Sequence, residues 1–93
     1  MPVVKLYANL RKIAGVRETE AVGDTVSLIL EDLAARFPEL ISKLLEDGRL
    51  RPHIVVTVNG HNIWTLNGLQ TQIKETDQIA IFPPIAGGKG QGD

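Results

Sequence analysis

Cysteine is absent from this sequence, and histidine occurs only twice in its 93 residues. A chain without thiols forms no disulfide and has no thiolate zinc site, cysteine nucleophile or redox pair. Two histidines also fall short of the three or four ligands of a zinc centre, so we expect no metal site. Whatever chemistry the chain takes part in uses no thiol of its own.

Long apolar runs and an excess of one charge are also missing. The longest apolar runs cover residues 54–58 and 79–84, far short of the ~20 residues of a membrane-spanning helix. No basic stretch followed by an apolar segment begins the chain, so no signal peptide is expected. Ten Lys and Arg against eleven Asp and Glu give a net charge of −1, which offers no electrostatic case for nucleic acid. We expect a cytoplasmic protein that binds neither membrane nor nucleic acid.

The residues that are present describe one ordinary globular domain. Hydrophobic residues make up 43% of the chain and charged residues 23%, a composition that supports a packed core. The length is that of a single domain. We expect residues 1–84 to form this domain and the glycine-rich residues 85–93, with Gly87 and Gly88, to form an extended, mobile tail.

Two segments near the N-terminus are predicted to be strands. Apolar and polar residues alternate over residues 3–10, which is typical of a half-buried strand. Gly15 then marks a turn. The more polar residues 17–22 predict a second strand that returns antiparallel to the first.

A helix is predicted next. Apolar residues recur at helical spacing from residue 26 to residue 37, after Asp24 or Thr25 as the N-cap. Pro38 ends or restarts this helix, because the residue before a proline avoids the helical region. The leucines that follow predict one or two further turns, with Gly48 as the C-terminal cap.

Three further strands are predicted in the second half. The β-branched residues 53–58 indicate a central strand. Asn59-Gly60 is a strong hairpin signal, after which residues 61–64 pair back as a short strand. Residues 66–73 are expected to be a loop, and residues 78–82 a last strand.

The order strand, strand, helix, strand, strand, strand predicts a two-layer α+β domain, in which one main helix covers one face of a mixed sheet. With the first and last strands side by side, this is the β-grasp arrangement.

Catalytic groups are not evident in this pattern. A catalytic pair of carboxylates needs two different environments, whereas the adjacent carboxylates at residues 31–32 and 46–47 are expected on solvated helix positions. His53 and His61 flank the predicted hairpin without a third ligand in register, and Trp64 is expected to be a core or rim aromatic residue. We therefore expect a protein that is not itself an enzyme.

The unusual feature is Phe82-Pro83-Pro84-Ile85-Ala86-Gly87-Gly88. Two prolines hold the chain extended and away from the sheet, and the side chains then shrink to none. Such a segment fits a narrow channel in a partner and reaches about 20 Å from the strand at roughly 3.3–3.6 Å per residue. The same composition also fits an ordinary frayed terminus.

Three motifs together resemble a known family. They are Leu10-Arg11-Lys12-Ile13-Ala14-Gly15, Val58-Asn59-Gly60 and the segment from Phe82 to Gly88. Over residues 3–88 the chain resembles the ubiquitin-like sulfur carriers of the molybdopterin synthase small subunit and thiamine sulfur carrier superfamily. Residues 48–53 and 66–69 also resemble a subgroup that includes carriers for cysteine synthesis and archaeal modifiers.

The resemblance implies a β-grasp fold and a function for Gly88. In this family an activating enzyme, an adenylyltransferase of the ubiquitin-activating type, uses ATP to adenylate the C-terminal glycine, which then becomes a thiocarboxylate. The carrier binds no cofactor. By resemblance Gly88 bears the sulfur and Gly87 and Ala86 give it access. A partner such as the molybdopterin synthase large subunit accepts the sulfur. We expect Tyr7, Phe82 and Pro83 to contribute to docking.

One departure from the family bears on this function. Residues 89–93 follow Gly88, and an internal glycine has no free carboxylate to be adenylated. Three explanations are open. A protease, such as a metalloprotease of the deubiquitinase type, trims residues 89–93; or these residues are an addition to the natural chain; or the protein has lost carrier chemistry and is now a binding module. The resemblance favours a sulfur carrier for molybdopterin synthesis, the small subunit of molybdopterin synthase, that needs removal of residues 89–93. Three other roles stay open: a carrier for cysteine or thiometabolite synthesis, a modifier whose Gly88 is joined to lysines of other proteins, and an interaction domain that never exposes Gly88.

Overall fold

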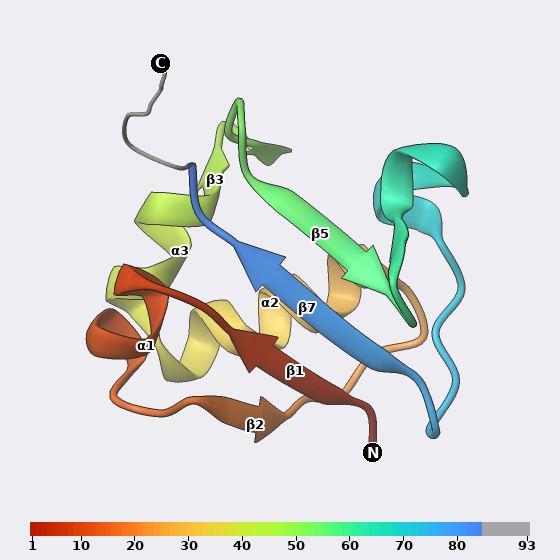
Figure 1. The fold of residues 1–93 in the computed structure, drawn as a ribbon, viewed down its shortest axis with the longest axis horizontal. Helices are drawn as coiled ribbons and strands as arrows, with labels where there is room; N and C mark the ends of the chain where they lie inside the picture. Colours follow the sequence, from red (N-terminus) through yellow and green to blue (C-terminus); the bar gives the residue numbers. More distant parts are fainter. Residues whose placement is uncertain (85–93) are drawn as a thin grey trace.

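The computed structural model describes residues 1–84 as one sheet with helices on one of its faces (Figure 1). The sheet strands are β1 Val3–Leu6, β2 Glu18–Glu20, β5 Val55–Val58, β6 His61–Asn62 and β7 Gln78–Phe82. The helices are α1 Asn9–Ala14, α2 Val26–Arg36 and α3 Pro38–Leu44, with short 3-10 turns η1 Ile63–Thr65 and η2 Gly68–Gln70. A separate hairpin pairs β3 Leu45–Glu46 with β4 Arg49–Leu50.

The sheet order is β2-β1-β7-β5-β6, which places the first and last strands side by side. β1 and β7 run parallel, with Val4 opposite Ile79 and Leu6 opposite Ile81, while the other pairs are antiparallel. A parallel pair joined through a helix on one face is the β-grasp topology, so the predicted fold class is confirmed.

The core lies between the helices and the inner face of the sheet. The inward residues of the strands are buried, and α2 supplies a buried stripe with the predicted helical spacing. The fully buried side chains of these elements include Val4, Leu6, Val56, Ile79 and Ile81 from the sheet and Val26, Ile29, Leu30 and Leu33 from α2.

We expect Leu33→Ala to lower the free energy of unfolding by about 2–5 kcal/mol, because it leaves a cavity under the sheet. Leu33 is 0% exposed. Leu28 lies on the same helix with 44% of its surface exposed, so Leu28→Ala is the matched control and changes stability little. Urea unfolding midpoints measure both effects. An unchanged midpoint for Leu33→Ala would contradict the placement of α2.

The predicted helix start and the role of Pro38 are both confirmed. The Thr25 side chain accepts a hydrogen bond from the Leu28 amide at 3.2 Å, which satisfies one free donor of the first turn. Pro38 begins α3 at a position where its missing N–H costs nothing. Of the helices within residues 1–84, none has the length and apolar character needed to cross a membrane.

The predicted strand over residues 3–10 is wrong beyond Leu6. Ala8 has a φ of 54°, which turns the chain out of the sheet, and α1 follows and ends at Gly15 with a φ of 80°. Leu10 is buried as expected but from a helix. Leu10 fits both the alternating pattern before it and a helical spacing with Ile13, so the sequence pattern does not show that the strand ends at Leu6.

The second half departs from prediction around the central strand, first at Gly48 and at the start of the strand itself. Gly48 caps no helix: α3 ends at Leu44, and Gly48 forms the β3–β4 turn with Asp47, both at positive φ. The central strand begins at Val55 rather than at residue 53, because His53 has a φ of 71°.

The segment after the hairpin is also less extended than predicted. The returning strand β6 has two residues instead of four, and residues 63–65 turn as η1 so that Ile63 is buried. The predicted loop at residues 66–73 contains η2. Trp64 is 60% exposed, so it is no core residue.

Asp77 fixes the turn that leads into β7. Its carboxylate accepts hydrogen bonds from the Lys74 amide at 2.8 Å and from Asn59 Nδ2 at 2.9 Å. The backbone bond from Lys74 and then the Asn59 bond lower the pKa of Asp77 below its ordinary value of 3.8. A lowered folded-state pKa stabilises the fold above the unfolded-state value, and this contribution is lost as the pH falls through the folded-state value.

We therefore expect Asp77→Asn to cost up to about 1 kcal/mol at pH 7, a modest value because the group is solvated. The difference from the parent chain should shrink as the pH falls below the unfolded-state pKa and toward the folded-state pKa of Asp77, because protonation removes the charge that the two hydrogen bonds stabilise. Urea midpoints of both chains near pH 7 and pH 3 test this. An equal difference at the two pH values would contradict the role assigned to the charge.

Candidate docking site at the end of the last strand

Tyr7 and Phe82 lie together where β1 and β7 end. The parallel register pairs Leu6 with Ile81, so the next residues of the two strands both emerge on the open face of the sheet. Their rings stack with centroids 4.5 Å apart and planes inclined by 15°. The Arg11 guanidinium lies 5.4 Å from the Tyr7 ring centre and covers part of this pair. Two of the predicted docking residues therefore form one aromatic surface.

An apolar groove of about 830 Å³ runs beside these rings. Pro83 contributes to it, so all three predicted docking residues are brought together. The sequence reasoning missed Val55, which pairs with Phe82 across the β5–β7 ladder and is 36% exposed. The sequence does contain a signal for Val55: it alternates with the buried Val56 and Val58, which places it on the open face of the sheet. The complete lining is Tyr7, Ala8, Asn9, His53, Val55, Phe82, Pro83 and Pro84.

Two non-glycine residues with positive φ stand on the rims of this groove. Ala8 has a φ of 54° and His53 a φ of 71°, backbone angles that residues other than glycine rarely adopt. Hydrogen bonds hold the first of them in place: the Arg11 amide donates to the Ala8 carbonyl, and Arg11 Nε donates to the Leu6 carbonyl at 3.0 Å. Strained backbone of this kind clusters where a surface is held ready for binding.

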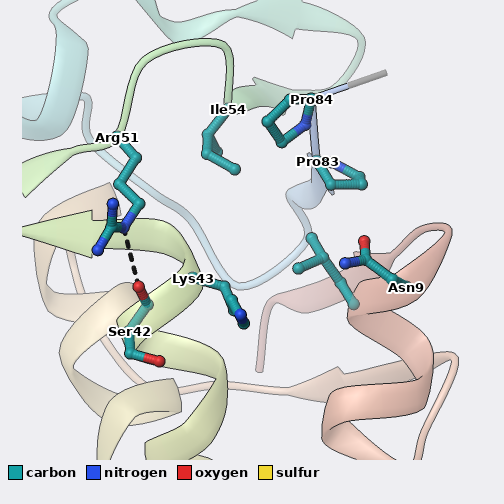
Figure 2. A pocket seen from close by; sticks show the side chains of 8 residues that line it. Asn9, Ser42, Lys43, Arg51, Ile54, Pro83 and Pro84 are labelled. Carbon is teal, nitrogen blue, oxygen red and sulfur yellow. Dashed lines mark hydrogen bonds between the residues drawn. The ribbon is translucent and has the colours of Figure 1, made fainter. Parts of the chain in front are cut away.

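A second pocket of about 290 Å³ lies against the same prolines (Figure 2). Lys43 and Arg51 line it, and Arg51 Nε donates to the Ser42 carbonyl at 2.8 Å. Arg51 Nη1 lies 3.7 Å from a Glu46 carboxylate oxygen, whereas Lys43 has no carboxylate within 4.0 Å among residues 1–84. The chain therefore leaves the domain between an apolar groove and a basic pocket.

The remaining predicted residues stand outside this surface or outside the described chain. His53 is at the groove rim, His61 is exposed in β6, and no three His, Asp or Glu of residues 1–84 are grouped to hold a metal. Ala86, Gly87 and Gly88 lie outside the described residues, as does the whole predicted tail. Their roles stay predictions.

A parallel pair of end strands, a helix across one face and an exit between two pockets define a ubiquitin-like β-grasp protein. Two solved structures share the fold at high similarity. One is small archaeal modifier protein 1 from Methanosarcina acetivorans, with a TM-score of 0.86 and 38% identity over 94% of this chain and 95% of that one. The other is a chain of the BexX/CysO complex from Amycolatopsis orientalis, with a TM-score of 0.87 and 30% identity over 95% of this chain and 100% of that one.

The chain belongs to the ThiS family, whose profile matches residues 4–88. Curated relatives agree. Small archaeal modifier protein 3 of Haloferax volcanii is 33% identical over 91% of this chain and 96% of its own length. The molybdopterin synthase sulfur carrier subunit of Escherichia coli is 31% identical over 91% of this chain and 96% of its own length. The chain is thus a ubiquitin-like sulfur carrier protein rather than a catalyst.

Proposed function

We propose that the chain carries sulfur as a thiocarboxylate on Gly88. The observation that carries this proposal is the position of Gly87-Gly88: the family match ends at residue 88, six residues beyond the end of β7. The docking groove at Phe82 and Pro83 lies where the chain departs toward that glycine. A partner that grips the groove is then placed to receive the segment that follows.

The chemistry needs a free carboxylate on Gly88. The carboxylate oxygen attacks the α-phosphorus of ATP on the activating enzyme, pyrophosphate leaves, and an acyl-adenylate forms. A hydrosulfide-equivalent donor then attacks the acyl carbon, AMP leaves with the electron pair of the broken C–O bond, and a proton is released. The product is the thiocarboxylate. The carrier contributes the reacting group and the docking surface, while its partners supply catalysis.

Residues 89–93 must therefore be removed first. We propose that a protease, a metalloprotease of the deubiquitinase type, hydrolyses the peptide bond between Gly88 and Lys89. Hydrolysis converts the Gly88 amide carbonyl into the carboxylate that adenylation requires. The cytoplasm, which supplies ATP, is the compartment we propose for these steps.

We propose the molybdopterin synthase large subunit as the sulfur acceptor. The support is the relative from Escherichia coli whose name assigns it to molybdopterin synthase. Two alternative functions are supported in the same way, by the names of similar proteins. The CysO relatives and the BexX/CysO complex support sulfur transfer to cysteine or thiometabolite synthesis. The archaeal modifiers support conjugation to lysines.

One experiment separates these acceptors. The thiocarboxylated chain ending at Gly88 is mixed in turn with the molybdopterin synthase large subunit and its substrate, with a cysteine-forming enzyme and its substrate, and with a cell extract. Sulfur should leave the chain only in the first mixture, seen as a mass decrease of the chain from sulfur back to oxygen. Transfer in the second mixture would replace the proposed acceptor, and so would lysines in the third that carry residues 75–88 after tryptic digestion, the remnant left by cleavage after Lys74.

A further inference from the structure

One edge of the molecule is formed by a segment without charged side chains. No Asp, Glu, Lys or Arg occurs between Arg51 and Lys74, although these residues make up 23% of the chain. The segment forms β5, the edge strand β6 and the turns η1 and η2, seen in green and teal on the right of Figure 1. A stretch of that length without charge stands out on a chain of otherwise mixed charge.

Trp64 is presented on this edge in a fixed position. Its side chain is 60% exposed, yet its ring lies against Gly68, where a Cβ would come within 2.7 Å of Cζ3. Asn62 Oδ1 accepts a hydrogen bond from the Trp64 amide at 2.9 Å. The neighbouring Leu66 is 44% exposed.

The turn beneath the tryptophan is itself held by a buried hydroxyl. Thr71 is 6% exposed, and its Oγ1 donates to the Gly68 carbonyl at 2.7 Å and accepts from the Asn67 amide at 3.0 Å. The backbone under the ring is therefore fixed before any partner arrives. An exposed aromatic residue that is already ordered loses little entropy on binding, which is the property of an interface hot spot.

We propose that this edge, defined by Trp64 and Leu66, is a self-association surface that pairs two copies of the chain about a two-fold axis. In a two-fold interface each patch meets its own copy, so any charge near the axis faces a like charge. An uncharged patch avoids that repulsion, whereas a highly charged partner would gain nothing from it. The groove at Phe82 differs, because the Arg11 guanidinium lies over Tyr7 at the groove and Lys43 and Arg51 line the adjacent pocket, which favours a partner of opposite charge.

Pairing through this edge leaves the docking groove open. Trp64 follows β6, the outer strand of the sheet, which β5 separates from β7, whereas the groove lies at the end of β7, where Phe82 pairs with Val55. In Figure 1 the teal turns and the point where the chain leaves residue 84 are on opposite sides. Self-association therefore stands independently of the proposed carrier function.

The test uses the full chain and its single tryptophan, whose fluorescence reports on this edge alone. Sedimentation equilibrium from about 5 μM to about 1 mM covers the affinity range of small interfaces. We expect the weight-average mass to rise from 10.1 kDa toward twice that value, with a blue shift of the emission over the same range. Trp64→Ser should raise the dissociation constant by at least about 30-fold, as for a hot-spot residue.

Two further variants keep the result interpretable. Leu66→Ser should weaken pairing in the same direction, and Leu28→Ser, at an exposed leucine on α2, should pair as the parent does. Circular dichroism checks that each variant is folded. A mass that stays at 10.1 kDa at the highest concentration overturns the proposal, as does unchanged pairing by Trp64→Ser. An emission shift that appears only when an activating enzyme is added would also overturn the proposal, because the edge would then be a binding surface for that enzyme.

Discussion

The chain ending at Gly88 is expected to form an adenylate with a cognate activating enzyme, and the chain ending at Asp93 is not. In the longer chain Gly88 has only an amide carbonyl, whereas adenylation requires a free carboxylate whose oxygen attacks the α-phosphorus of ATP. Removal of a reacting group lowers rates by on the order of 10³-fold or more. ATP–pyrophosphate exchange measures the difference directly.

Gly88→Val in the chain ending at residue 88 provides the matched control for this result. It keeps the free carboxylate but adds a branched side chain where the partner channel is expected to be narrow. We expect the same urea midpoint as the parent and no activation. Normal exchange by this variant would argue against the narrow-channel account, and exchange by the chain ending at Asp93 would argue against trimming.

Val55→Asp is expected to raise the KM of the Gly88-terminated chain for its activating enzyme by about 30-fold, the loss typical of a hot-spot contact. The substitution puts a carboxylate into the apolar groove beside Phe82, and this carboxylate must lose its water when the partner docks. The kcat should change little, because Val55 lies at the docking groove and not at the reacting glycine. Steady-state exchange kinetics separate the two parameters.

Leu28→Asp is the control for this experiment. Leu28 is exposed to a similar degree but lies in the first turn of α2, away from the groove, where an acidic side chain is tolerated by the helix N-terminus. It should leave KM unchanged. An unchanged KM for a folded Val55→Asp chain would show that the groove is not where the enzyme docks.

The elements with long, unambiguous patterns were predictable from the sequence. The stripe from Val26 to Leu33 has a helical period and a capping Thr25, and the last strand ends at two prolines that cannot continue a ladder. The adjacency of β1 and β7 came with the family resemblance, because strand order is set by tertiary packing and not by local pattern.

The missed elements are those in which one residue satisfies two patterns. Leu10 fits both the strand before it and α1, and only the turn at Ala8 decides between them. Gly48 follows apolar helical residues and so resembles a cap, but Asp47 beside it forms a hairpin turn. Short segments of this kind are decided by what they pack against.

The candidate site was predicted in part for the same reason. Tyr7, Phe82 and Pro83 lie on one surface, because residues near the ends of parallel neighbours fall at the same sheet edge, and their role in docking stays a prediction. Val55 and His53 reach that surface only through the β5–β7 register, which the sequence does not fix. Residues 86–88 stay predictions.

The measurement that tests the central claim most directly is the intact mass of the protein isolated from its native cells. We predict a mass that lacks residues 89–93, with a fraction of molecules in which one oxygen is replaced by sulfur. A mass retaining residues 89–93 in all molecules, even after incubation with the activating enzyme and ATP, would contradict it. The chain would then be a β-grasp binding domain whose Gly87-Gly88 takes no part in sulfur transfer.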